Sequence, residues 1–176
     1  AITLENKRIN VSLFKNKSYV LTQDFDFGID LIIKDISKLC SLKINEVEFL
    51  LKEINLKTAL EYNEDSHLDK FFFSTSPYRK IKHQLILDII VARLDEIIEI
   101  CYEKNSNLNY LKKNNDTIYI HIEKFEYFKN LHFALHKNKL IDPMFVFGQN
   151  TEELSLLSLN GAVELISKGW NKEAIP

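Results

Sequence analysis

Residues 8–28 read RINVSLFKNKSYVLTQDFDFG, and this stretch decides the fold. Its first part places Ile9, Val11 and Leu13 on one face of an extended segment, since alternate residues of a strand point the same way. After a lysine-rich turn, Tyr19–Phe27 resumes the extended pattern. The stretch therefore predicts a β-hairpin.

A helical pattern follows the hairpin and runs from Gly28 to Leu39, where apolar residues recur at steps of three and four. Asp30 lies near its start, where the helix dipole favours a carboxylate. We therefore expect the second strand to end at the glycine and a helix to begin there.

A second helix is expected over Ile44–Ile54, with Asn45 as its N-cap. Glu48 is the residue expected to reach back from the following turn. The next stretch, Asn63–Ser76, is mostly polar and predicts a loop or an edge hairpin.

Pro77 opens the most periodic part of the chain, a predicted helix that continues to Cys101. Its apolar face is broad, which indicates burial on more than one side. Two strands and two helices complete the predicted order, which is that of an α/β fold. The strands are Thr117–Ile122 and Met144–Phe147, and the helices are Phe125–Leu135 and Glu152–Lys168.

The composition is that of a folded domain, because 45% of the 176 residues are hydrophobic. We expect one lobe over residues 1–176, or a core of 1–55 plus 77–176 with 56–76 as an inserted loop or hairpin. The formal net charge of −2 gives no global reason to expect binding to nucleic acid or to anionic lipid. No apolar run reaches the length of a membrane span. The chain starts inside a predicted strand, so we expect an excised domain. Any membrane contact is then expected to run through segments outside it.

Catalytic and metal-binding patterns are weak throughout. Cys40 and Cys101 fall inside apolar helical patterns and are expected to be reduced core residues. His132 and His136 are four residues apart, but no carboxylate completes a metal motif, so no metal site is predicted.

No Ser or Cys lies in a nucleophile motif, so no catalytic residue is predicted. The acidic pair at Asp24 and Asp26 is expected on the solvent side of a half-buried strand.

Three consecutive aromatic residues, Phe71, Phe72 and Phe73, interrupt the polar stretch. If the segment is extended, all three cannot face one core, and we expect Phe72 at least to be exposed. An exposed aromatic residue is a common anchor for a partner or for a second copy of the chain. The alternative is that the run fills a gap between subdomains.

The order of elements resembles the C-terminal half of the actin-like (ribonuclease H-like) ATPase superfamily, in particular the FtsA and PilM group and the cytoplasmic domain of the GspL family. The hairpin stretch resembles the phosphate-binding strand-turn-strand, IDLIIKDISKLCSLKINEVEFLL resembles the helical segment after it, and IKHQLILDIIVARLDEIIEICYEK resembles the long helix. The resemblance covers nearly the whole chain and implies a mixed sheet with flanking helices.

The nucleotide loops of that superfamily are degenerate in this chain. Where the family has a glycine-rich phosphate turn, this sequence has Glu5, Asn6 and Lys7, and a glutamate there repels phosphate. Where the family has a glycine-rich adenosine loop, this sequence has His121, Ile122, Glu123 and Lys124. The resemblance then implies that no nucleotide cofactor is held, whereas the alternative is that both segments are ordinary strand ends.

The resemblance further implies a non-catalytic scaffold on the cytoplasmic side of the bacterial inner membrane. Its partners would be the assembly ATPase and the inner-membrane platform proteins of a type IV pilus or type II secretion system, with a homodimer also possible and no nucleic acid. The main alternative is a divergent FtsA-like division protein that binds ATP and tethers division filaments. A relic of a small-molecule kinase or a sugar-binding module is a third class, which no residue favours.

Overall fold

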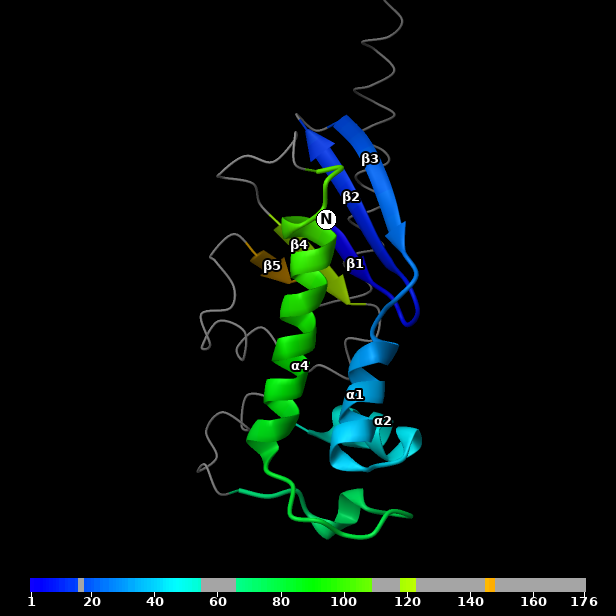
Figure 1. Ribbon diagram of the computed structural model, residues 1–176, viewed down its shortest axis with the longest axis vertical. Helices are drawn as coiled ribbons and strands as arrows, with labels where there is room; N and C mark the ends of the chain where they lie inside the picture. The colour runs from blue at the N-terminus through cyan, green and yellow to red at the C-terminus, as the bar shows by residue number, and fades with distance from the viewer. Residues whose placement is uncertain (16–17, 55–65, 109–117, 123–144, 148–176) are drawn as a thin grey trace, which may run out of the picture.

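The computed structural model describes residues 1–15, 18–54, 66–108, 118–122 and 145–147 (Figure 1). Its strands form one sheet in the order β3-β2-β1-β4-β5. β1 pairs antiparallel with β2 and β2 with β3, whereas β4 runs parallel to β1 and β5 parallel to β4. The strands are β1 (Ile2–Leu4), β2 (Ile9–Lys15), β3 (Ser18–Phe25), β4 (Ile118–Ile122) and β5 (Phe145–Phe147).

This order and these directions are those of a ribonuclease H-like, actin-like lobe, and the predicted α/β class is confirmed. The three antiparallel strands follow one another closely in the sequence, whereas the parallel pairing of β4 with β1 requires a long crossover connection. The hairpin predicted from residues 8–28 is confirmed as β2 and β3, and both later strands lie where the sequence placed them.

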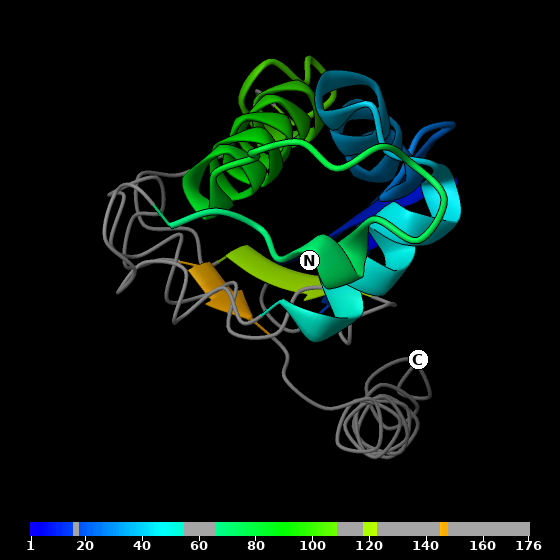
Figure 2. The same cartoon turned by 90° about the horizontal axis from the view of Figure 1, so that it is seen from below.

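One face of the sheet is apolar because the inward-facing residues of neighbouring strands lie opposite one another. Ile2 lies opposite both Val11 and Ile120, and Leu4 lies opposite both Ile9 and Ile122. All six side chains are buried in the core cluster. α1 (Asp30–Cys40) continues beyond the end of β3, and α4 (His83–Ile98) runs beside it, with its C-terminal part in front of the sheet (Figures 1 and 2).

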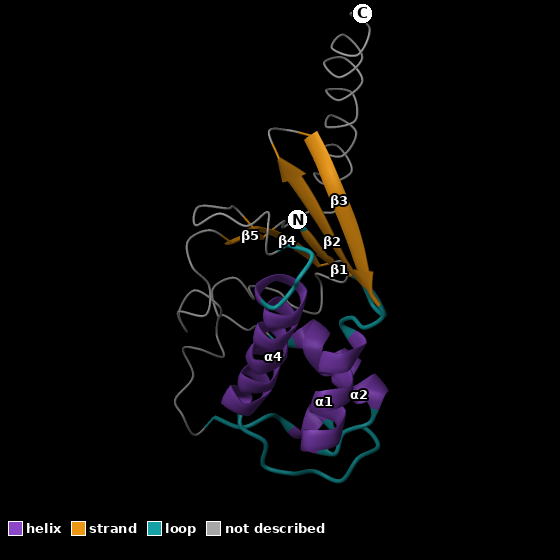
Figure 3. Cartoon of the chain, turned by 45° about the horizontal axis from the view of Figure 1, so that its top comes forward, coloured by secondary structure: helices purple, strands orange, loops and turns teal. Residues whose placement is uncertain are grey.

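A smaller group of helices lies at the end of the molecule away from the sheet (Figure 3). α2 (Ile44–Glu53) packs against α1, and a short 3₁₀ turn, η1 (Lys70–Phe72), packs against α2 (Figure 3). α4 is buried on a wide arc, as its sequence predicted: it contacts α1, and its buried residues belong to the same core cluster as those of the sheet. A π-helical segment, η2 (Glu99–Glu103), continues α4 and carries buried Cys101.

The predicted start of the long helix at Pro77 is wrong, since α4 begins at His83. The chain before it is held extended by a bridge between His67 and Lys82 and by the Leu68 N–H, which donates to the Ile81 carbonyl over 2.8 Å. Ile81 therefore belongs to the core without being helical. Within the described residues 66–76, the stretch Asn63–Ser76 is the predicted loop, with a 3₁₀ turn and a single bridge residue. The helices predicted at 125–135 and 152–168 lie outside the described residues.

Both cysteines are free and buried, as expected. Burial raises the pKa of the Cys40 thiol to about 11 and that of the Cys101 thiol to about 12. Among the helices that the structure describes, none is both long and apolar enough to cross a lipid bilayer.

Gly28 lies at the junction between β3 and α1, against the turn that joins β1 to β2. A Cβ atom at this position would lie 2.7 Å from the Asn6 carbonyl oxygen and 2.8 Å from the Arg8 nitrogen, and closer still to the Glu5 carbonyl oxygen. All three atoms belong to the backbone, so no side-chain rotation relieves the clash. Glycine is required here because the backbone of the turn lies too close to leave room for a side chain.

We expect Gly28→Ala to lower the free energy of unfolding by about 2–4 kcal/mol, because the turn and the helix must move apart. Urea unfolding followed by far-UV circular dichroism measures the change. Ser41→Gly is the control, since Ser41 follows α1 with a φ of 54°, a conformation that glycine adopts without strain. An unchanged midpoint for Gly28→Ala would contradict the close approach.

Candidate functional site

The turn at the expected phosphate position directs its carbonyl groups at the first residues of the first helix. The Glu5 carbonyl accepts from the Ile29 N–H and the Asn6 carbonyl accepts from the Asp30 N–H, each over 2.9 Å. Free N–H groups at a helix N-terminus are what binds phosphate in nucleotide-binding folds. At α1 two of these donors are already satisfied within the protein.

A shallow hollow of about 460 Å³ lies beside this turn. Its lining carries the carboxylates of Glu5 and Asp26 and the cations of Lys7 and Arg8, together with Asn6. The formal charges cancel, so the hollow has no net positive charge with which to attract a polyphosphate. The three predicted residues Glu5, Asn6 and Lys7 are thus brought together, at the turn where the sequence placed them.

The residues predicted at the adenosine loop are only partly described. His121 lies on β4 opposite Thr3 of β1, and its Nδ1 is buried without a hydrogen-bond partner among the described residues. Ile122 is buried in the core beneath the helices. Glu123 and Lys124 lie outside the described residues.

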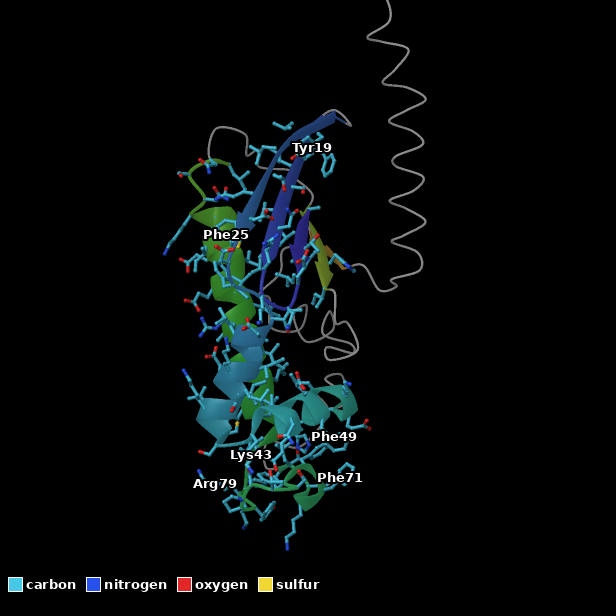
Figure 4. All side chains as sticks on the ribbon, turned by 90° about the vertical axis from the view of Figure 1, so that its right-hand side faces the viewer. Tyr19, Phe25, Lys43, Phe49, Phe71 and Arg79 are labelled. Carbon is cyan, nitrogen blue, oxygen red and sulfur yellow. The ribbon has the colours of Figure 1, made fainter. Side chains whose placement is uncertain are left out.

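The aromatic run forms a surface cluster with a residue that the sequence analysis did not single out. Phe49 of α2 lies 5.0 Å from Phe71 and 6.0 Å from Phe72 between ring centroids, and Phe71 lies 5.5 Å from Phe72. We call Phe49, Phe71 and Phe72 the aromatic patch. Figure 4 shows Phe49 and Phe71 at the helical end of the molecule.

The expectation that Phe72 is the exposed member of the run is wrong. Phe71 is 68% exposed, whereas Phe72 and Phe73 are half-buried against the core. The run is not extended: Lys70–Phe72 is a 3₁₀ turn, in which successive side chains point in three directions. Phe73 instead packs on Tyr78, with ring centroids 5.2 Å apart.

A buried carboxylate holds the loop that carries this run. Glu46 of α2 is 1% exposed and accepts hydrogen bonds from the backbone N–H groups of Thr75 and Ser76, over 2.7 and 2.9 Å. The hydroxyl groups of Ser74, Thr75 and Ser76 donate to the same carboxylate. The Lys43 N–H adds a further hydrogen bond of 3.0 Å at the start of the helix.

Hydrogen bonding decides the protonation state of this carboxyl group. Burial alone would raise the pKa of Glu46, but hydrogen bonds from the Ser76 side chain and from the backbone of Thr75, Lys43 and Ser76 outweigh it. The pKa therefore falls well below its ordinary value of 4.5. The loop binds the charged form of the side chain.

Glu46 was not predicted because the expected N-cap, Asn45, lies two residues after the observed one. Lys43, not Asn45, is the N-cap residue, so Glu46 and not Glu48 occupies the position that reaches back to the cap. A lysine side chain has no acceptor atom, so the usual Ser or Thr signal of a capping box is absent. The signal that remains is the Ser74-Thr75-Ser76 triplet before Pro77.

The predicted acidic pair lies on the solvent side of the sheet. Asp24 and Asp26 are exposed, as expected, and Asp24 accepts a hydrogen bond of 2.9 Å from the Asn10 amide. No group of three or more His, Cys, Asp or Glu residues within the described ranges could hold a metal ion. His132 and His136 lie outside those ranges.

We expect Glu46→Gln to lower the free energy of unfolding by about 2 kcal/mol at pH 7, since a neutral amide accepts fewer and weaker hydrogen bonds. The contribution of a carboxyl group with a lowered pKa is complete above its unfolded-state pKa. It is lost as the pH falls through the lower, folded-state pKa, so the two proteins should converge below pH 4.5.

Urea unfolding of both proteins between pH 3 and pH 8 measures this difference. Glu48→Gln is the matched control on the same helix and should change stability by less than about 0.5 kcal/mol. A difference between wild type and Glu46→Gln that stays constant across the pH range would contradict the charged, hydrogen-bonded state of Glu46.

No protein-family model matches this sequence, and no curated protein matches it either. Among solved structures, the chain is similar to component A of the (R)-2-hydroxyglutaryl-CoA dehydratase of Acidaminococcus fermentans, with 12% sequence identity and a TM-score of 0.41. The similarity covers 84% of this chain and 54% of that protein, so this chain spans about half of its length.

Proposed function

We propose that this chain is a non-catalytic binding domain that holds a partner protein against the aromatic patch. The observation that carries the proposal is the exposure of Phe71 beside Phe49, on a loop that buried Glu46 fixes in place. Large exposed aromatic side chains are frequent anchors of interfaces. A loop that is ordered before binding loses less conformational entropy when the partner arrives.

The turn between β1 and β2 supports a role without nucleotide. Its carbonyl groups satisfy the first N–H groups of α1, and Glu5 adds a negative charge where a phosphate would lie. A bound triphosphate would have to displace these hydrogen bonds and approach a carboxylate. Protein binding therefore fits the described surface better than ATP hydrolysis does.

The partner we propose is the assembly ATPase of a type IV pilus or type II secretion system, with the inner-membrane platform proteins around it. The ribonuclease H-like sheet and the replaced glycine turn are the features that support this choice, because they fit the GspL and PilM resemblance. The domain would then work on the cytoplasmic side of the bacterial inner membrane, with membrane contact made by segments outside this chain. The FtsA-like alternative differs in requiring ATP.

Titration with ATP and magnesium separates these two functions. We expect no heat in calorimetry and no rise in melting temperature, because the helix N-terminus at Ile29 and Asp30 is already occupied. Lysozyme of the same molar concentration gives the baseline of dilution heat. Micromolar binding would sink the scaffold proposal and favour an FtsA-like division protein.

Phe71→Ser should weaken binding of the assembly ATPase from the same organism at least about tenfold, since it removes the exposed anchor of the patch. Isothermal calorimetry or a quantitative pull-down measures the change. Tyr19→Ser is the matched control: Tyr19 is an aromatic residue 53% exposed, and Figure 4 shows it at the opposite end of the molecule.

Two results would count against this assignment. If the unaltered chain does not bind the ATPase at high micromolar concentration, the proposed partner is wrong. If Phe71→Ser and Tyr19→Ser weaken binding equally, the aromatic patch is not the docking surface.

A further inference from the structure

A second surface lies between α1 and α4, away from the aromatic patch. One hollow of about 450 Å³ lies where the chain enters α4, and another of about 440 Å³ continues along the two helices. Leu39 and Asp88 line both, so the two hollows form one continuous depression, which we call the α1–α4 groove. Figure 4 shows Arg79 on one side of the helical end and Phe49 and Phe71 on the other.

The groove is apolar along its middle. Leu39 is 66% exposed and Leu85 is 42% exposed, on helices that face each other across it. Leu85, Ile89 and Ala92 follow one another at steps of four and three along α4, which makes a continuous apolar stripe. Two packed helices with such a stripe between them provide the groove into which a third amphipathic helix packs.

The two ends of the groove differ in charge. At the α4 entry, Arg79, Lys80 and Lys82 line the hollow, and the described residues include no carboxylate that forms an ion pair with Arg79 or Lys80. The Arg79 guanidinium donates instead to the uncharged Ser41 hydroxyl over 3.0 Å. At the other end, Lys38 and Arg93 are balanced by two carboxylates, and Arg93 forms ion pairs with both of them, with Asp35 at 2.6 Å and with Glu96.

The N-terminus of α4 adds to the positive potential at the basic end. This helix of 16 residues has no acidic residue in its first turn, so the positive end of its dipole is not balanced within its own sequence. The carboxylate of Asp88, one turn further on, accepts a hydrogen bond of 2.7 Å from the Gln84 amide. The basic end therefore favours an anionic ligand.

We propose that the α1–α4 groove binds an amphipathic helix of a partner protein. Its apolar face covers Leu39 and Leu85, and its Asp or Glu side chains lie against Arg79 and Lys80. A flat anionic membrane fits the surface less well, because the groove is concave and because its far end, where Lys38 and Arg93 face Asp35 and Glu96, has no net positive charge. This site is separate from the aromatic patch and extends the proposed function to a second contact.

The test uses a fluorescent synthetic helix of about 18 residues, with Leu at every third and fourth position and Glu on both flanks. Fluorescence anisotropy should show micromolar binding to the full chain, weaker at higher salt because the charges are screened. The double variant Arg79→Glu/Lys80→Glu should lose about tenfold or more in affinity, and so should Leu39→Ser.

Two controls fix the location of this binding. Phe71→Ser, on the aromatic patch, and Lys7→Glu, an exposed lysine at the β1–β2 turn, should bind the peptide as the unaltered chain does. Because Leu39, Arg79 and Lys80 are all exposed, the variants should retain the melting temperature of the parent chain. Since Phe71→Ser leaves the peptide bound, failure of this site and failure of the aromatic patch are distinguishable.

Three outcomes would overturn the proposal. They are absence of binding to the Glu peptide, equal binding of a peptide with Lys in place of Glu, and an affinity that the groove variants do not change. Co-sedimentation with phosphatidylserine vesicles tests the membrane alternative. Vesicle binding that the double variant abolishes, without binding of the peptide, would assign the groove to a membrane surface instead.

Discussion

The close contact between Gly28 and the β1–β2 turn fixes where the first helix leaves the sheet. The backbone of the turn accepts hydrogen bonds from the first residues of α1, and the absence of a side chain at Gly28 allows this approach. α4 then packs beside α1, and the ion pair between Arg93 and Asp35 joins the two helices. The apolar face of the sheet and the groove on the outer side both depend on this placement.

The same contact occupies the first N–H groups of α1 with hydrogen bonds inside the protein. A glycine-rich phosphate turn exposes its N–H groups to the ligand, whereas this turn uses its carbonyl groups to complete a helix and carries a glutamate. At the helical end of the molecule, by contrast, a buried carboxylate stabilises a loop. There Glu46 is enclosed by the protein, and its hydrogen bonds hold a loop in a shape that leaves Phe71 in solvent.

Local patterns predicted most of the described elements. The hairpin of β2 and β3, the helices α1 and α2 and the strand β4 follow from periods of two and near four, because each buries one face against a common core. The start of α4 was predicted wrongly because a proline is a good first helical residue. The pairing of residues 66–68 with 81–83 keeps the chain extended beyond it.

Glu46 was missed for a similar reason, since its partners Ser74, Thr75 and Ser76 lie about thirty residues away and no local rule joins them. The exposure of Phe71 depended on a 3₁₀ turn that the three phenylalanines themselves do not specify.

The two buried cysteines also determine how the chain reacts with thiol reagents. With pKa values of about 11 and 12, only about one thiol in ten thousand or fewer is ionised at neutral pH, and both side chains lie inside the core. The folded protein therefore behaves toward maleimides and mild oxidants as if it contained no cysteine. A single cysteine introduced on the surface would then be modified selectively, and reaction of the native thiols would report opening of the core around α1 and the end of α4.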